Sequence, residues 1–240
     1  MVTGPVKTRI GDLSSDGKTG PPPFVGSRFE LPGTFLREPG NTVVSHVLPG
    51  SGTEAALLDV RARMMALPHA HHFAFTAPTS LHMTVAQGVL ETRRVPGYWP
   101  QGVGLDVPVD AITALYLERF ASVTDQGHFE VRVKDLTPYG LVVAGATPDD
   151  ENTLRQWRDH LVGPFGYRHP DHDTYEFHIT FAYLGKWLPP EAIDPYAEAL
   201  QAMLSELQRS NPVLELDRPA LCSFEDMNHF EPLLYLRQAG

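Results

Sequence analysis

Two short apolar strings, each built around His-x-Thr, constrain this chain more than any other feature. They are Leu-His-Met-Thr-Val at residues 81–85 and Phe-His-Ile-Thr-Phe at residues 177–181. Side chains alternate between the two faces of a β-strand, so His and Thr two positions apart point the same way. A single copy would say little, but two copies in matching surroundings predict two polar strand faces that meet around one small anion. The polar side chains are His82, Thr84, His178 and Thr180.

The sequence before each string repeats the same order of elements. Residues 41–47 have the pattern of a strand and residues 53–65 that of a helix, with Thr53 as its N-cap. Before the second string, residues 139–144 again predict a strand. A helix is expected after Thr147, because a proline and acidic residues occupy its first turn.

The sequence after each string also repeats, which predicts an internal duplication. Residues 107–120 have a partner in residues 213–224, and His-Phe-Glu at 128–130 returns at 229–231, each time before an expected strand. The repeated unit is strand–helix–strand–strand–strand. The approximate repeats are residues 39–134 and 139–238.

These paired motifs resemble the 2H phosphoesterase superfamily, which includes RNA 2′,3′-cyclic phosphodiesterases, RNA ligase-like enzymes and U6 RNA-processing exonucleases. Residues 39–42, 72–84 and 176–183 are similar to its uncharacterised DUF1868-type branch. The resemblance covers roughly residues 38–238. It implies an α+β, internally duplicated, bilobal fold in which two antiparallel-rich sheets face each other across a central cleft, with helices outside. Each lobe contributes one His-x-Thr, and the branch brings no assigned substrate.

The domain organisation follows from composition along the chain. Residues 1–38 are rich in Gly, Pro, Ser and Lys, which predicts a loop-rich N-terminal arm that wraps the fold without a core of its own. Residues 39–240 are expected to form a single bilobal domain with interleaved lobes. The Pro- and Gly-rich residues 95–104 are the expected linker between the halves.

Charge and cysteine content limit the partners. Nineteen Lys and Arg against 29 Asp and Glu give a net charge of −10, whereas proteins that hold long nucleic acids usually present a basic face. We therefore expect a small phosphoester, nucleotide or RNA-end substrate, no duplex nucleic acid, and a monomer. The chain shows neither a membrane span nor a secretory signal, and its one cysteine, Cys222, fits a reducing compartment. The expected location is the cytoplasm.

The four motif residues suit acid–base chemistry on a phosphodiester. Because histidine titrates near pH 6.5, a pair can hold one neutral and one protonated ring. The neutral ring removes a proton from water or a sugar hydroxyl, and the imidazolium protonates the leaving oxygen. Thr84 and Thr180 would donate hydroxyl hydrogen bonds to the phosphate, so neither a metal nor another cofactor is expected. The near-symmetry of the motifs does not tell which of His82 and His178 is the acid.

Four further residues are candidates for supporting or substrate-binding roles. Ser80 and Glu176 lie two positions before each histidine, and Glu176 would orient His178 or raise its pKa, or instead be a solvated carboxylate. Asn41 follows a Pro-Gly turn, which suits asparagine, and the family resemblance implies that it matters. Tyr183 and its counterpart Gln87 come three positions after each threonine. On a regular strand both would face away from the cleft unless a bulge intervenes.

Two other classes of function stay open. The clusters at residues 69–72 and 169–173 contain His and Asp and would suit a metal-dependent hydrolase, although neither matches a known metal motif. We favour loops that rim the cleft for both. The fold would also serve a non-catalytic nucleotide-binding module. Intact His and Thr in both halves favour catalysis, and only the N-terminal arm favours a partner-binding protein.

Overall fold

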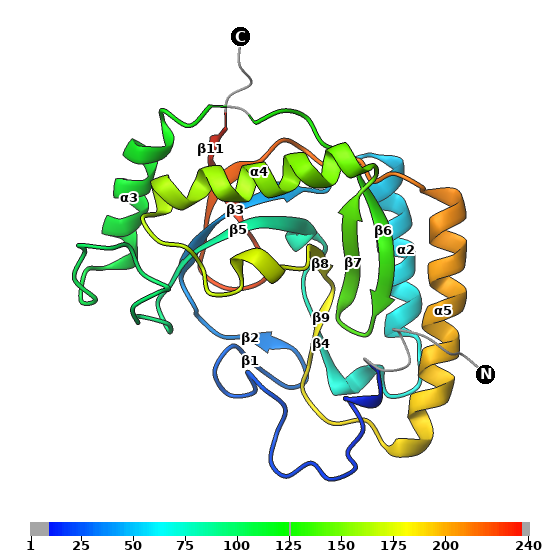
Figure 1. Ribbon diagram of the computed structural model, residues 1–240. Helices are drawn as coiled ribbons and strands as arrows, with labels where there is room; N and C mark the ends of the chain where they lie inside the picture. Colours follow the sequence, from blue (N-terminus) through cyan, green and yellow to red (C-terminus); the bar gives the residue numbers. More distant parts are fainter. Residues whose placement is uncertain (1–9, 125, 237–240) are drawn as a thin grey trace.

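The computed structural model describes residues 10–124 and 126–236, which form an α+β fold (Figure 1). The strands are β1 (Phe29–Glu30), β2 (Thr34–Phe35), β3 (Gly40–His46), β4 (Phe73–Phe75), β5 (His82–Leu90), β6 (Val131–Thr137), β7 (Gly140–Gly145), β8 (His178–Thr180), β9 (Ala182–Leu184), β10 (Ala220–Phe224) and β11 (Glu231–Tyr235). The longer helices are α2 (Gly52–Met65), α3 (Val109–Phe120), α4 (Pro148–Phe165) and α5 (Ile193–Ser210).

Within the described residues, seven strands form one antiparallel sheet in the order β11-β10-β3-β5-β8-β7-β6. The expected α+β class is confirmed. The strands of the two halves are not separate sheets, however, because β5 and β8 pair at Met83 and Ile179 and join them. The two His-x-Thr strings therefore lie on adjacent strands at the centre of one sheet, and β4 and β9 form a small two-stranded sheet beside it.

The helices pack in two pairs, α2 beside α5 next to β6, and α3 beside α4 against the central strands (Figure 1). The predicted start of α4 is confirmed, because Thr147 and Asp150 form a reciprocal capping box. The N-cap of α2 is Ser51, not Thr53 as expected. The Thr53 hydroxyl instead accepts the Glu215 backbone N–H at 2.8 Å, which ties α2 to a distant segment. No helix of the described residues has the length and apolarity needed to cross a membrane.

One expected correspondence between the halves is wrong. Residues 112–120 belong to helix α3, with Ile112, Tyr116 and Phe120 buried along one face at helical spacing. Their supposed partner, residues 220–224, is strand β10, an apolar run held between β3 and β11. In sheet order β10, rather than β11, occupies the position that mirrors β6. The duplication itself stays a prediction.

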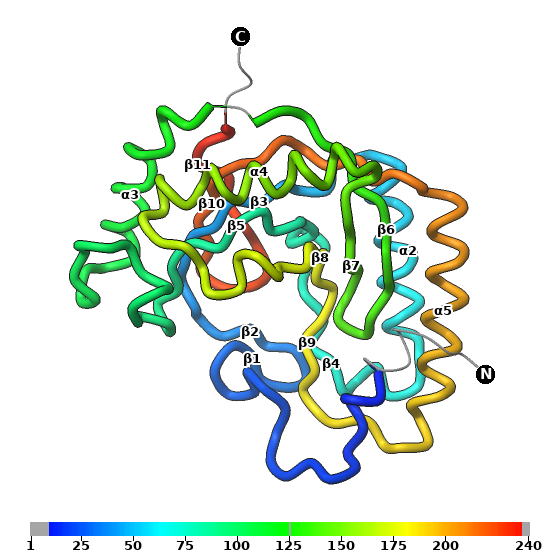
Figure 2. The backbone as a smooth tube through the Cα atoms, in the orientation of Figure 1, coloured from blue at the N-terminus to red at the C-terminus, as the bar shows by residue number. Residues whose placement is uncertain are grey.

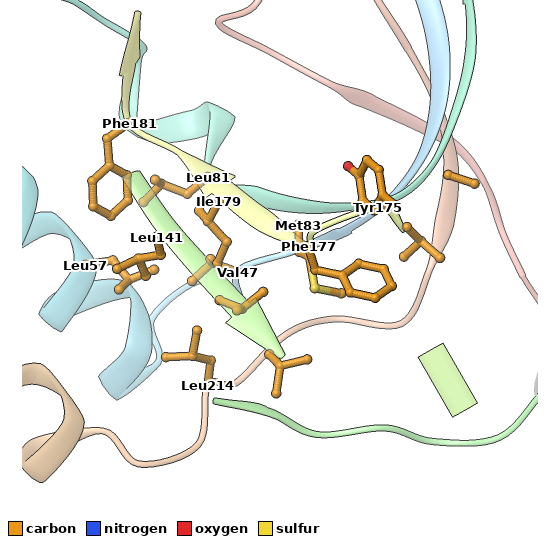
Figure 3. Close-up of a cluster of buried hydrophobic side chains, with 14 of the residues drawn as sticks. Val47, Leu57, Leu81, Met83, Leu141, Tyr175, Phe177, Ile179, Phe181 and Leu214 are labelled. Atoms are coloured by element: carbon orange, nitrogen blue, oxygen red, sulfur yellow. The ribbon is translucent and has the colours of Figure 1, made fainter. Parts of the chain in front are cut away.

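Both motifs are anchored in the hydrophobic core. The anchoring residues are the apolar ones that alternate with the histidines and threonines along each strand. Leu81 and Met83 flank His82, and Phe177 and Ile179 flank His178; all four are buried. Figure 3 shows them gathered with Leu57 of α2 and Leu141 of β7 in one cluster. Because successive side chains of a strand point to opposite faces, this packing holds the polar partners on the other face of the sheet.

Met83 allows a direct test of this anchoring. Its side chain is 0 % exposed at the β5–β8 pair, whereas Met65 at the end of α2 is 49 % exposed. Replacing Met83 by alanine is expected to lower the free energy of unfolding by about 2–5 kcal/mol, because it leaves a cavity in a close-packed core. The matched variant Met65→Ala should change it by less than about 0.5 kcal/mol in the same urea titration. Equal effects of the two variants would contradict this packing.

The N-terminal arm joins the same core. Its described part, residues 10–38, runs beside β4 and β9 (Figure 2) and carries the short ribbon of β1 and β2. Ile10 and Leu13 are buried in the main hydrophobic cluster. The ring centroid of Phe29 lies 5.8 Å from that of Tyr183 in β9. The arm therefore packs against the main core instead of standing apart from it. Residues 1–9 of the predicted arm lie outside the described residues.

Candidate functional site

The two His-x-Thr motifs share one cavity of about 520 Å³ on the face of the sheet opposite the helices. The Met83–Ile179 pair fixes the geometry, because its antiparallel register sets Thr84 across from His178 and His82 across from Thr180. Directly opposed residues have Cβ atoms about 4.5–5.5 Å apart, and diagonal neighbours such as the two histidines about 7–8 Å. Two imidazoles and two hydroxyls thus line one wall of the cavity.

Matching hydrogen bonds hold the two imidazoles. His82 Nδ1 lies 2.6 Å from the Ser80 carbonyl oxygen, and His178 Nδ1 lies 2.9 Å from the Glu176 carbonyl oxygen. A carbonyl only accepts, so Nδ1 carries a proton in both rings. In each ring Nε2 is then the atom that takes up or gives up a proton. The same contact, two residues back along the chain, gives both histidines the same tautomer.

His82 differs from its partner in its surroundings. Burial lowers its pKa from the usual value to about 3, and the nearby imidazoles of His46 and His178 act in the same direction, whereas the hydrogen bond to Ser80 opposes them. The ring of Phe230 contributes to this burial, with its centroid 4.0 Å from that of His82. The His82 imidazole is therefore neutral at neutral pH in the ligand-free protein.

The lowered pKa of His82 predicts how stability depends on pH. Above about pH 6.5 the ring is neutral in both the folded and the unfolded chain, and its contribution is constant. As the pH falls from 6.5 towards 3, His82 becomes protonated in the unfolded chain but stays neutral in the folded protein. The free energy of unfolding therefore decreases. His82→Gln should therefore lose less stability than wild type between pH 6.5 and pH 4 in urea titrations. A parallel loss would show that His82 titrates normally.

Bulges bring two more side chains to the cleft. On β5, the register with β3 shifts between Val44, opposite Thr84, and Val43, opposite Ala86, so one extra residue enters β5. Gln87 therefore lines the cavity together with Thr84. On the second motif, the N–H groups of Phe181 and Ala182 both donate to the Tyr139 carbonyl, and Tyr183 returns to the cavity. The expectation for regular strands does not hold at either position.

Side chains from helix α4, strand β3 and the loop after α4 satisfy the carbonyls at the β5 bulge. Arg158 Nη1 donates to the Val85 carbonyl at 2.7 Å, the Thr42 hydroxyl to the Ala86 carbonyl at 3.0 Å, and the Tyr167 hydroxyl to the Gln87 carbonyl at 3.0 Å. A bulge leaves backbone groups without their ladder partners, and buried groups of this kind need replacements. These polar residues are thus what maintains the bulge.

Comparison with known proteins places the chain. A family model described as 2H-phosphodiest, domain of unknown function (DUF1868), matches residues 28–142. A crystal structure of a conserved protein of unknown function from Agrobacterium tumefaciens strain C58 is 45 % identical, with a TM-score of 0.93, over 95 % of this chain and 98 % of that one. The chain belongs to the 2H phosphodiesterase family of the DUF1868 type. No curated protein compared with it matches.

Membership of the 2H phosphodiesterase family supports a phosphoesterase, hence a hydrolase, in general terms. The family model includes His82 and Thr84 but ends before the second motif. His178 and Thr180 lie instead in the region that the similarity to the Agrobacterium tumefaciens structure covers. Neither match names a substrate.

The supporting candidates of this 2H phosphodiesterase differ in where they lie. Ser80 is buried in the cavity wall. Asn41 also lines the cavity. Its side-chain amide links β3 to α3 and β5, because Nδ2 donates to the Thr113 hydroxyl at 3.1 Å and Oδ1 accepts the Val89 N–H at 3.0 Å. Glu176 lines two neighbouring cavities, with its carboxylate 3.6 Å from Lys134 Nζ. The His178 ring is oriented by donating from Nδ1 to the Glu176 backbone carbonyl, not by the Glu176 carboxylate.

Several cavity residues of this 2H phosphodiesterase were not foreseen from the sequence. Phe24 and Arg28 reach the cavity from the arm, and the Arg28 guanidinium lies 4.3 Å from the Phe24 ring centroid and 5.4 Å from that of Tyr183. Phe230 and Arg93 come from other loops. No local pattern marks Arg28, Arg93 or Phe230 as a residue of the cavity. Phe24 has the one available signal, a large aromatic in a loop-rich segment, and the structure shows it 48 % exposed at a φ of 72°.

Residues outside the cavity lining hold a histidine of each of the two His and Asp clusters. His72 Nδ1 is 3.0 Å from the Trp187 carbonyl, and His172 Nε2 is 2.8 Å from an Asp159 carboxylate oxygen. Neither cluster is among the described residues that line the cavity, so the expectation that they rim it is not met there. Within residues 10–124 and 126–236, no three His, Cys, Asp or Glu side chains are placed to hold a metal ion.

Proposed function

We propose that this 2H phosphodiesterase hydrolyses a small phosphodiester by acid–base catalysis from His82 and His178, without a metal. The substrate class we favour is a cyclic phosphate or a small nucleotide or RNA-end phosphodiester. One observation carries the proposal: two imidazoles, whose Nε2 atoms have no hydrogen-bond partner among the described residues, and two threonine hydroxyls lie around the Met83–Ile179 pair in one cavity.

We assign the two proton transfers by the positions of the rings. His82 is held neutral and suits the base, so its Nε2 takes the proton of the attacking water as the new P–O bond forms. His178 suits the acid, because it lines both the first cavity and a second of about 590 Å³ beside it. The leaving oxygen takes the proton of His178 as its bond to phosphorus breaks. In a linear phosphodiester the departing group has space in the second cavity, whereas in a cyclic phosphate the leaving oxygen stays on the same sugar.

Thr84 and Thr180 suit the stabilisation of charge on the phosphate. Each threonine lies directly opposite the histidine of the neighbouring strand, on the same face of the sheet. A phosphorus atom between the two rings is therefore also between the two hydroxyls. Hydroxyl donors aimed at the non-bridging oxygens stabilise the charge that develops in the transition state. With proton transfers from the histidines, this supplies the main requirements of phosphodiester hydrolysis.

The dimensions and charge of the site favour a small substrate. A cavity of about 520 Å³ lies within the range of pockets for single small molecules. The chain has a net charge of −10, which disfavours a long polyanion. A mononucleotide or the last nucleotide of an RNA end fits both conditions.

A panel of phosphodiesters in EDTA tests the proposal. The panel contains nucleoside 2′,3′-cyclic phosphates, short RNAs ending in a cyclic phosphate, 3′,5′-cyclic nucleotides and linear dinucleotides. We expect turnover of at least one class that EDTA leaves unchanged. Activity that EDTA abolishes and divalent metal restores would contradict metal independence. Binding of nucleotides without turnover of any class would identify a non-catalytic module instead.

A further inference from the structure

The end of the cavity that lies beyond the motifs is basic, because Arg93 lines it. From Thr84, β5 continues through its bulge to Gln87, and the Gln87 side-chain oxygen accepts a hydrogen bond from Arg93 Nη2 at 3.2 Å. Arg93 itself lines the cavity, and its guanidinium lies 4.2 Å from the ring centroid of Tyr98. Its Nε is buried and has no hydrogen-bond partner among the described residues. The Arg93 guanidinium is thus a cationic group of the cavity wall whose hydrogen bonds within the described residues are incomplete.

The charge of Arg93 is not balanced nearby. The other arginine in the wall, Arg28, has its Nε 2.6 Å from a Glu38 carboxylate oxygen, and the second Glu38 oxygen accepts the Thr92 hydroxyl at 2.6 Å. The Glu38 carboxylate therefore balances the charge of Arg28 and is not a partner of Arg93. The described residues include no carboxylate within salt-bridge distance of Arg93, and Asp171, which acts on it from farther away, is bonded to His169.

The pKa shifts of the two arginines agree with these contacts. Burial lowers the pKa of Arg28, but the hydrogen bond and the charge of Glu38 more than offset it, so the net shift is upward. Burial lowers the pKa of Arg93 as well, and there the net shift is downward, with the charge of Arg28 contributing. A guanidinium stays charged in proteins, so Arg93 is a partly desolvated cation that lacks an anion.

We propose that this end of the cavity binds a second phosphate group of the substrate, held by Arg93. Arginine binds phosphate with charge-assisted N–H donors, and no carboxylate among the described residues lies within salt-bridge distance of the Arg93 guanidinium in the cavity wall. This proposal rests on the proposed function, which puts the reacting phosphate between the histidines. It narrows the substrate to a nucleoside phosphodiester that also carries a terminal phosphate.

The spacing along β5 fits this substrate class. Thr84 and Gln87 are three residues apart, which is roughly 10 Å along a strand and less across a bulge. The side chains of Thr84 and Arg93 both extend into the cavity and shorten the gap between the two anion positions. A ribose with one phosphate at its 2′ or 3′ oxygen and another at its 5′ oxygen spans such a gap.

Calorimetric titration with two product-like probes tests the second phosphate site without requiring turnover. The probes are adenosine 2′-monophosphate and adenosine 2′,5′-bisphosphate, at one fixed salt concentration. Wild type should bind the bisphosphate at least about tenfold more tightly, the gain of one charge-assisted pair. In Arg93→Gln that ratio should fall to near one. Arg94→Gln is the control, because Arg94 pairs with Glu91 and lies outside the cavity lining.

Further variants and outcomes keep the two proposals distinct. Arg93→Lys retains the charge without the guanidinium donors and should keep part of the preference, while thermal denaturation shows whether each variant is folded. Equal binding of both probes by wild type, or a preference that persists in folded Arg93→Gln, would overturn the second phosphate site and leave the proposed function standing. Failure of wild type to bind either probe would contradict the nucleotide substrate class itself.

Discussion

Alanine at His82 or at His178 is expected to lower kcat by about 10²–10⁴-fold, the usual contribution of one general acid or base. Each ring is half-buried with one wall open to the cavity, so truncation removes the proton transfer and leaves the core residues on the other face of the sheet in place. His160→Ala is the matched control, because this exposed histidine of α4 is outside the cavity lining. Its kcat should equal that of wild type.

The two histidine variants should respond differently to the leaving group. A p-nitrophenyl phosphodiester departs as a weakly basic anion and needs little protonation. His178→Ala, which lacks the proposed acid, should therefore recover most of its lost activity on this substrate, whereas His82→Ala should not. Recovery in His82→Ala alone would reverse the assigned roles. Activity of either variant equal to wild type on the natural class of substrate would remove that histidine from the mechanism.

Valine at Thr84 or at Thr180 has the second-largest expected effect on activity. Each substitution keeps the shape of the side chain and removes one hydroxyl donor, and loss of one such donor typically costs about 10²–10³-fold in kcat. Because valine suits a strand as well as threonine does, the free energy of unfolding should change by less than about 1 kcal/mol. Activity is measured by steady-state kinetics and stability by urea titration.

The control for the threonine variants is Thr34→Val, at an exposed position of β2. It should change neither kcat nor stability. A different result at Thr84 or Thr180, a fall in stability of several kcal/mol with little change in the kcat of the folded fraction, would show that these hydroxyls support the fold rather than the substrate.

The meeting of the two motifs was predictable because it depends on local rules. Alternation along a strand sets His82 and Thr84 on one face, and Met83, fully buried on the other, fixes which face meets the core. The same holds for the second motif with Ile179. The start of α4 was also predictable, since its capping box is formed by neighbours in sequence. What these features share is that a few adjacent residues determine them.

Features set by distant contacts were not predictable. The bulge that turns Gln87 into the cavity depends on Arg158, Thr42 and Tyr167, whose side chains replace the lost ladder partners. Ser51 caps α2, and the Thr53 hydroxyl instead accepts the backbone N–H of the distant Glu215. In each case a short segment is bonded to a group far away in the sequence.

The difference between the two histidines also lies beyond the sequence. Both sit in the same local motif with the same hydrogen bond to a carbonyl two residues back. Burial, to which the ring of Phe230 contributes, and the neighbouring imidazoles of His46 and His178 lower the pKa of His82 to about 3 and keep its ring neutral at neutral pH. The arm likewise reaches the cavity through Phe24 and Arg28, which nothing in its loop-rich composition indicated.

The most direct test of the central claim is a crystal structure of the wild-type protein with a nucleoside 2′-monophosphate bound. The account predicts that one phosphate lies within hydrogen-bonding distance of Nε2 of both His82 and His178 and of the hydroxyls of Thr84 and Thr180. A phosphate bound outside this cavity, or one that contacts a single histidine while the other ring turns away, would contradict the two-histidine mechanism.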